Sequence, residues 1–215
     1  MLTEDYLMRY LRIATAALAQ LVGLKAAGLD QDALFLLDRS LEQILGLRID
    51  LIRILSSNDL LKLLSEQERM DPSLLVILGD LFTGEADLLN RLGRPIDGKA
   101  SAFHALTLTI EGWFAEGKEP EIEEKIANLV SRLGEETMPE EIIFNLFSYY
   151  REKGDDGLAF TTLDDLLVQS GYQADLMDLA RDYFTALLEK SVTDLEQSGL
   201  SRRDVQTALD QLEES

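Results

Sequence analysis

The sequence predicts an all-α protein, an irregular array of antiparallel helix hairpins arranged as an α-α superhelix. Leu, Ala, Glu, Asp and Gln recur at spacings of three and four residues, which places apolar side chains along one face of a helix. The period-two alternation that is typical of strands is nearly absent. Glycines and helix-capping residues also divide the chain at intervals of about one helix.

The first helix is predicted over residues 3–27, with Thr3 as N-cap and Gly28 as the stop signal. Its apolar stripe is formed by Tyr6, Tyr10, Ile13, Ala17, Leu21 and Leu24. Asp30 is expected to cap a second helix that ends near Gly46.

Residues 47–70 are rich in Leu and are predicted to form two short helices, with Ser57 capping the second. Asp71 and Pro72 mark another start, because proline is tolerated in the first turn, where its missing N–H has no partner to lose. This helix is expected to continue through Leu81.

Glycines interrupt the middle of the chain at Gly84, Gly93 and Gly98. We therefore expect two helical halves, residues 1–98 and residues 99–215, joined without a long linker and packed together as one unit.

The second half is predicted to form helices over residues 99–116, 119–133, 137–153 and 174–197, one that ends at Gly171, and a last short one. Thr137 and Glu140 have the spacing of a capping box. Ser201, with Asp204 three residues later, is expected to cap the last helix.

The chain is acidic, with 20 Lys and Arg against 40 Asp and Glu and a formal net charge of −20. Residues 1–100 carry a net charge of −4, so residues 101–215 carry −16. This balance argues against binding to nucleic acid or to anionic membranes. It favours a protein or peptide partner, of basic character if the partner is charged.

Several features indicate a cytoplasmic protein. The 215 residues include no cysteine, which excludes disulfides and thiolate chemistry. Glu4 and Asp5 stand where a secretory signal carries positive charge. Apolar runs such as residues 73–79 are shorter than the ~20 residues that span a bilayer, so no membrane helix is expected.

A weak repeat recurs after three glycines. Small or aliphatic residues lie 5, 9 and 13 positions after each one, as in Ala33, Leu37 and Leu41 after Gly28, in Ala159, Leu163 and Leu167 after Gly154, and in Ile122, Ile126 and Val130 after Gly117. Together with Tyr150 before Gly154, this pattern resembles tetratricopeptide (TPR) repeats. The resemblance implies TPR-like helix hairpins and protein binding. The family's tryptophan, small residue and proline have no counterpart at Ile143, Phe147 and Gly171.

The two ends of the chain show a second resemblance. Residues 4–9 (EDYLMR), the glycine-joined helix pair after them, and residues 199–205 (GLSRRDV) are similar to an uncharacterised, all-helical bacterial family found mostly in Gram-positive organisms. This resemblance implies a bacterial, cytoplasmic protein and assigns no activity.

Catalytic and metal-binding patterns are not apparent. His104 is the only histidine, and Ser101 occupies the position where a di-iron bundle has glutamate. No Gly-x-Ser-x-Gly elbow accompanies it. The turn from Gly154 to Gly157 lacks the alternating carboxylates of a calcium loop. We expect neither cofactor nor metal and predict that the chain is not an enzyme.

If the TPR resemblance extends to function, two groups of residues would line a concave, peptide-binding surface. They are His104, Glu111 and Phe114 in one unit, and Phe144, Asn145, Ser148 and Arg151 in another. The leading hypothesis is therefore a non-enzymatic protein-protein interaction module. The alternatives are a structural homo-oligomer with apolar residues at a subunit interface, and an enzyme of an unrecognised type.

Overall fold

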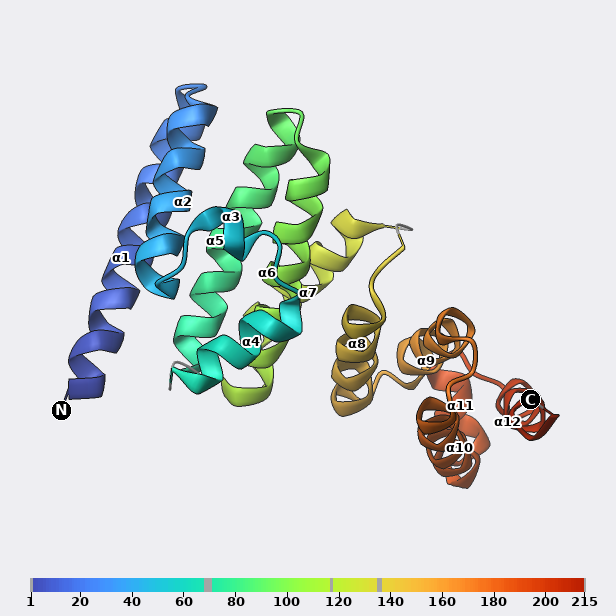
Figure 1. Ribbon diagram of the computed structural model, residues 1–215. Helices are drawn as coiled ribbons and strands as arrows, with labels where there is room; N and C mark the ends of the chain where they lie inside the picture. The colour runs from blue at the N-terminus through green and yellow to red at the C-terminus, as the bar shows by residue number, and fades with distance from the viewer. Residues whose placement is uncertain (1, 68–70, 117, 135–136, 215) are drawn as a thin grey trace. The chain divides into compact units, whose positions relative to one another are not determined.

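The computed structural model describes residues 2–67, 71–116, 118–134 and 137–214, and every regular element in these ranges is an α-helix (Figure 1). The predicted all-α class is confirmed. The chain forms two compact units, Met1–Glu136 and Thr137–Ser215. The boundary predicted near Gly98 lies inside a helix of the first unit instead.

The first unit is built around a central helix pair. Its helices are α1 (Leu2–Ala26), α2 (Asp30–Leu45), α3 (Ile49–Ile52), α4 (Ser57–Glu66), α5 (Pro72–Arg91), α6 (Pro95–Glu116) and α7 (Pro120–Leu133). Helices α5 and α6 pair tightly; α1 and α2 contact α5, while α4 and α7 contact α6. Leu37, Leu78, Phe82, Leu106 and Trp113 are fully buried between them.

Glycines allow α5 and α6 to approach closely. A Cβ on Gly112 would lie 2.5 Å from Val76 Cγ2, and one on Gly79 would overlap Thr109 Oγ1. Such a contact leaves no room for a side chain, so the backbones themselves meet. This pairing keeps both sides of the predicted boundary at Gly98 within one unit.

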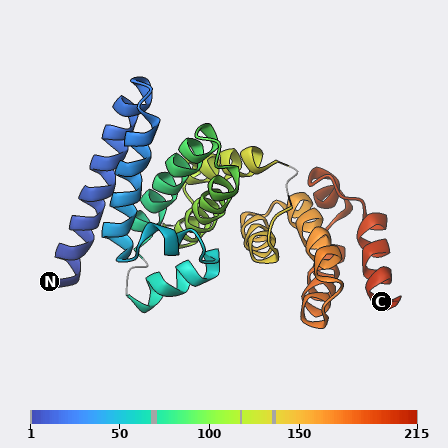
Figure 2. The same ribbon diagram turned by 45° about the horizontal axis from the view of Figure 1, so that its top comes forward.

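The second unit contains α8 (Glu140–Lys153), α9 (Asp156–Ser170), α10 (Ala174–Glu189), α11 (Val192–Gln197) and α12 (Arg202–Glu214) (Figure 2). Helix α8 pairs with α9, and α10 contacts both α9 and α12. Its core includes Phe147, Leu163, Tyr183, Phe184 and Val205.

The glycine-based repeat correctly predicted buried positions. Gly28 and Gly154 adopt positive φ angles of 71° and 82°, which glycine accommodates without strain. All the predicted followers are buried except Val130, which is partly buried: Ala33, Leu37, Leu41, Ala159, Leu163, Leu167, Ile122 and Ile126. The third glycine of the pattern, Gly117, lies outside the described residues.

Some predicted caps are confirmed and others are corrected. Asp71 Oδ1 accepts from Leu74 N at 3.2 Å, and Ser201 Oγ accepts from Asp204 N at 3.1 Å. Helix α4 is capped by Ser56 rather than Ser57.

Two other helices begin without the predicted side-chain cap. The N-cap of α2 is Leu29 rather than Asp30, and that of α8 is Pro139 rather than Thr137. Neither makes a side-chain capping bond.

Two helix lengths also differ from prediction. Helix α5 continues past Leu81, because Gly84 is a packing position: a Cβ there would lie 2.9 Å from Leu21 Cδ2. The single helix predicted over residues 174–197 is broken before Ser191, which caps α11 by accepting from Asp194 N at 3.1 Å.

Candidate functional site

His104, predicted to face a ligand, lies in the core of the first unit and is 2% exposed. Its Nε2 is 3.1 Å from the carbonyl oxygen of Ile52, and its Nδ1 is 3.1 Å from Ser57 Oγ. Since a carbonyl only accepts, Nε2 carries the proton and Nδ1 accepts from the Ser57 hydroxyl. Burial lowers the pKa of His104 to about 4, so the ring is neutral at pH 7 and serves to anchor α3 and α4.

The two other predicted residues on α6 are closer to the surface. Phe114 is 40% exposed and packs edge-on against Trp113, with ring centroids 5.2 Å apart. Glu111 is partly buried, and burial raises the pKa of its carboxyl group. The structure therefore leaves Phe114 the more accessible of the predicted contacts on this helix.

The four predicted residues on α8 belong to the second unit. Phe144 and Arg151 are exposed, and the Arg151 guanidinium lies 5.4 Å from the centroid of the Phe147 ring. Ser148 is partly buried, and the buried Nδ2 of Asn145 has no hydrogen-bond partner in the described structure. Their spacing places Phe144, Ser148 and Arg151 on one side of the helix.

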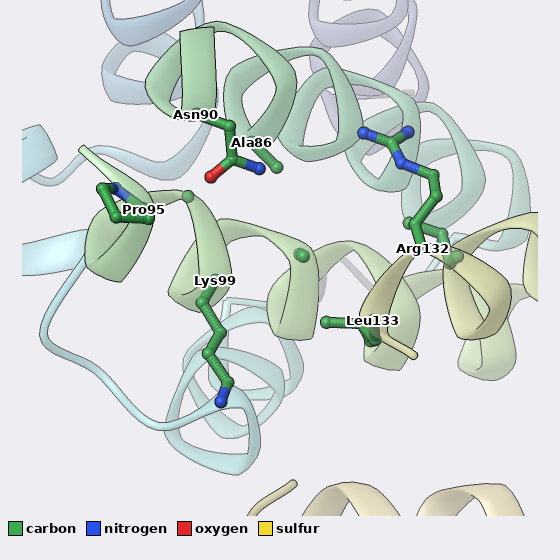
Figure 3. Close-up of a pocket in the computed structure, with 9 residues that line it drawn as sticks. Ala86, Asn90, Pro95, Lys99, Arg132 and Leu133 are labelled. Carbon is green, nitrogen blue, oxygen red and sulfur yellow. The ribbon is translucent and has the colours of Figure 1, made fainter. Parts of the chain in front are cut away.

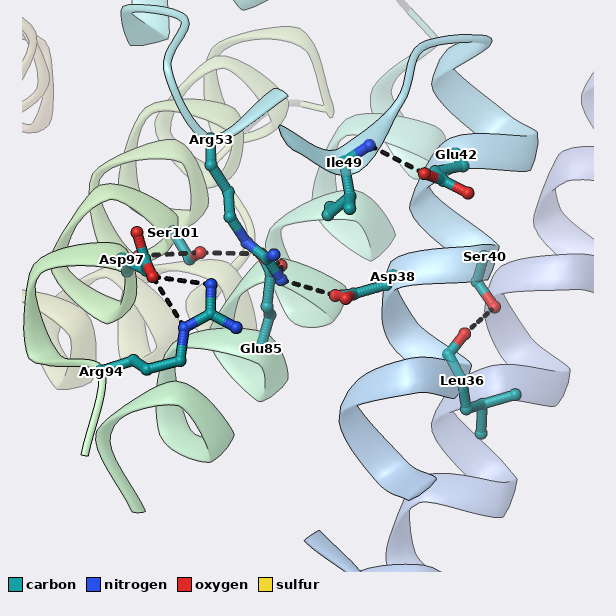
Figure 4. A network of polar contacts seen from close by, with 10 residues as sticks. All are labelled: Leu36, Asp38, Ser40, Glu42, Ile49, Arg53, Glu85, Arg94, Asp97 and Ser101. Carbon is teal, nitrogen blue, oxygen red and sulfur yellow. Dashed lines mark hydrogen bonds and ion pairs between the residues drawn. The ribbon is translucent and has the colours of Figure 1, made fainter. Parts of the chain in front are cut away.

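A buried network of charged residues, which the sequence did not predict, joins four helices of the first unit (Figure 4). The Nη2 atom of Arg53, just after α3, donates to Asp38 Oδ1 on α2 at 2.6 Å and to Glu85 Oε1 on α5 at 2.5 Å. Ser101 of α6 donates to Glu85 Oε2 at 2.7 Å. The side chain of Glu85 is fully buried. The sequence does not single out Glu85, because α5 carries three acidic residues, Asp80, Glu85 and Asp87, within an otherwise apolar segment.

The charge balance of this network perturbs Asp38. Burial and the nearby Glu85 carboxylate raise the pKa of Asp38 to about 7, against the opposing effect of Arg53. Two carboxylates thus compete for one guanidinium. We interpret the network as a structural clamp, because its contacts tie the residue after the short α3 to α2 and α5.

Two cavities lie among α5, α6 and α7. The smaller, of about 100 Å³, is lined by residues that include Ala86, Asn90, Lys99, Arg132 and Leu133 (Figure 3). The larger, of about 360 Å³, adjoins Asp80, Lys125 and Arg132.

Ion pairs neutralise two of the cations at these cavities, Lys125 and Arg132. Lys125 Nζ lies 2.7 Å from Asp80 Oδ2, and Arg132 pairs with Asp87. In Figure 3 the side chain of Lys99 runs away from Asn90. Among the described residues, no group of three or more His, Cys, Asp or Glu is placed to hold a metal ion.

Helix α1 is apolar and largely exposed. An 18-residue window within residues 5–26 has a mean hydropathy of 1.2, so by length and composition alone this helix could cross a membrane, a property shared by helices of globular cores and by signal sequences. Arg9, Arg12 and Lys25 interrupt the segment, so it contains no long unbroken apolar run. Only 17% of that window is buried. In the structure α1 packs on α2 and α5, and Lys25 Nζ lies 3.2 Å from Asp87 Oδ2 of α5.

The face of α1 opposite its buried residues is largely uncharged. Ala14, Ala17 and Leu21 face the unit's interior. The opposite face, hereafter the outer face of α1, is formed by Met8, Leu11, Thr15, Ala19, Val22 and Ala26. Of these, only Leu11 is partly buried, and Val22 is 70% exposed.

No family model matches the chain, and neither the curated proteins nor the solved structures contain a match to it.

Proposed function

We propose that the chain is a non-catalytic interaction module with TPR-like helix hairpins that binds another protein through the outer face of α1. The observation that carries this proposal is the exposure of that face: no charged residue occurs between Arg12 and Lys25, yet α1 lies at the edge of its unit (Figure 1). Exposed apolar faces of this kind are typical of interaction sites.

The hairpin architecture supports the proposal. Helix α1 pairs with α2, and α8 pairs with α9, each across a glycine in the left-handed conformation, as in helical repeat proteins. The outer face of α1 is mostly exposed and carries no charged residue, which supports another protein as the surface that covers it.

Catalysis has less support from the described structure. His104 directs its two ring nitrogens to Ser57 and Ile52. Glu85 directs its carboxylate to Arg53 and Ser101. These buried ionisable groups therefore serve packing.

Site-specific photo-crosslinking in cells tests the proposal. A photoreactive residue at Val22 should give a discrete protein adduct, because this side chain lies on the outer face of α1. The matched control is Val168 on α9, which is 61% exposed and lies in the other unit. No adduct at Val22, or the same adducts at both positions, would overturn the proposal.

A further inference from the structure

The buried charges around Arg53 do not balance. Arg53 supplies one positive charge, and its Nη2 atom donates both to Asp38 Oδ1 at 2.6 Å and to Glu85 Oε1 at 2.5 Å (Figure 4). The side chains of Arg53, Asp38 and Glu85 are 8%, 21% and 0% exposed. With both carboxyl groups ionised, one uncompensated negative charge would be held out of water, at a high cost in free energy. A proton on one of the two carboxyl groups removes that charge.

Among the residues that the structure describes, other groups on the surrounding helices do not neutralise the cluster. Glu42, one turn after Asp38 on α2, accepts from Ile49 N at 2.9 Å and adds no positive charge. His104 of α6 directs its ring nitrogens to Ile52 and Ser57. The nearby cations pair with other carboxylates, lie over an aromatic ring or are exposed: Lys25 with Asp87, Arg48 with Asp50, Arg91 with Asp30, Arg94 with Asp97, Lys99 over Phe103, and the exposed Arg9, Arg12 and Arg39.

The hydrogen bonds of the cluster indicate which carboxyl group takes the proton. Glu85 accepts from Arg53 Nε at 3.0 Å, from Arg53 Nη2 and from Ser101 Oγ at 2.7 Å. Asp38 accepts only from Arg53 Nη2 in the described part of the chain. Because donors stabilise the charged form of a carboxylate, Asp38 is the better proton acceptor of the pair. Burial, opposed by Arg53 and reinforced by Glu85, raises the pKa of Asp38 to about 7.

We propose that Asp38 takes up a proton near neutral pH and that this proton controls the contact between α2 and the α3 segment, residues 49–53. The protonated carboxyl group accepts from Arg53 through one oxygen and donates to the Glu85 carboxylate through the other, which holds α2, α3 and α5 together. This inference does not depend on the function proposed above.

Loss of the proton leaves two carboxylates in competition for one guanidinium. Glu85 retains Arg53, because it accepts from both Nε and Nη2 and has no access to water. Asp38 is the most exposed of the three side chains and turns toward solvent, where its charge is hydrated. The α3 segment then loses its polar contact with α2, so the contact is a pH-sensitive switch.

Asp38→Asn tests the proposal, because an amide has the shape of a protonated carboxyl group and can donate to Glu85. At and above pH 7 the variant should be more stable than wild type, whereas loss of an ordinary ion pair would make it less stable. Urea denaturation of the full chain, followed by Trp113 fluorescence, gives the equilibrium constant of unfolding. The ratio of the wild-type constant to that of the variant should rise by up to about tenfold per pH unit between pH 3.8 and pH 7, where only the folded state keeps the proton.

Asp50→Asn is the matched control, because Asp50 pairs with Arg48 at the surface and its side chain is 71% exposed. The corresponding ratio for this variant should not rise over the same range. If Asp38→Asn is less stable than wild type at pH 7, or if its ratio is independent of pH, Asp38 is an ionised partner of Arg53 and the proposal is overturned.

Two measurements on the wild-type chain do not require a folded variant. The side-chain carboxyl carbon of Asp38, assigned by NMR through its own backbone, should titrate with a midpoint near pH 7, and a midpoint at or below pH 3.8 would overturn the proposal. The amides of Ile52 and Arg53 donate to the carbonyl oxygens of Arg48 and Ile49. Their protection from hydrogen exchange should fall as the pH rises through 7, relative to amides of the second unit. Unchanged protection would show that the proton does not control the contact and would overturn the switch.

Discussion

Arg53 is the residue on which the buried charges of the first unit depend. Its side chain is 8% exposed and lies between Asp38 and the fully buried Glu85. Leaving a buried carboxylate without a cation destabilises the fold far more than a surface ion pair stabilises it. Arg53 therefore matters to stability mainly because its removal would leave the Glu85 carboxylate buried without a cation.

Arg53→Ala should lower the free energy of unfolding by about 3 to 5 kcal/mol, because Glu85 would remain buried without its partner. Urea denaturation followed by Trp113 fluorescence measures this change. Arg48→Ala is the matched control: Arg48 pairs with Asp50 but is 79% exposed, so its loss should cost at most about 1 kcal/mol. Equal effects of the two variants would contradict the clamp.

His104 should make the stability depend on pH. Its folded-state pKa is about 4 against an ordinary value of 6.5, so between these values the unfolded chain binds more protons. The stabilisation by neutral His104 is fully present above pH 6.5 and is lost as the pH falls toward 4.

The comparison of wild type with His104→Gln isolates this contribution. The stability difference should shrink by up to about 1.4 kcal/mol per pH unit on acidification between pH 6.5 and pH 4. Asp38, whose pKa is raised to about 7, gives an opposite slope that is common to both proteins and cancels. A difference independent of pH would show that His104 stays equally protonated in both states.

At the scale of the elements, one hydroxyl group caps the helix that follows the break between α10 and α11. Ser191 Oγ accepts from Asp194 N at 3.1 Å and donates to Asp194 Oδ2 at 2.6 Å. Ser191→Ala should destabilise the second unit by about 1 kcal/mol. Thr193→Ala in the same helix is the control, and thermal unfolding followed by circular dichroism should show little change for it.

The contact between α5 and α6 can be tested by a double-mutant cycle. Gly79→Ala should cost about 1 to 3 kcal/mol, because the new methyl group overlaps Thr109 Oγ1. Thr109→Ala removes that oxygen, so the double variant should recover part of the loss. Additive effects in chemical denaturation would contradict direct contact.

Element positions were predictable where periodicity and punctuation agree, as for α2, α7, α9 and α12. Prediction failed where one residue type has two uses. Gly84 resembles a helix stop but is a packing position under Leu21, and Ser191 in an otherwise helical segment is a cap. Such distinctions depend on tertiary neighbours that local pattern does not contain.

The candidate site was less predictable than the fold. The resemblance to TPR repeats predicted that His104 lies on a surface. In the structure α3 and α4 cover the ring and bind both of its nitrogens, so His104 is a core residue. Arg53 and Glu85 are 32 residues apart, so their pairing has no local signature. The contacts predicted on α8 and at Phe114 remain predictions.

At the scale of the whole molecule, the two units should unfold separately. Trp113 is the only tryptophan and is fully buried in the first unit, so its fluorescence reports that unit alone. Arg53→Ala should shift the fluorescence transition, and Ser191→Ala should shift only a part of the circular dichroism transition. One transition that moves identically in both probes for both variants would indicate a single cooperative unit.

The clamp around Glu85 has a consequence for motion within the first unit. Asp38, Arg53, Glu85 and Ser101 come from segments far apart in the chain, and the departure of either Arg53 or Glu85 removes a partner from two of the other residues. Amide protons of α2, α5 and α6 near these residues should therefore exchange with solvent deuterium in one shared opening event. A local opening at α3 should therefore be coupled to an opening of α5 around Glu85, 32 residues further along the chain.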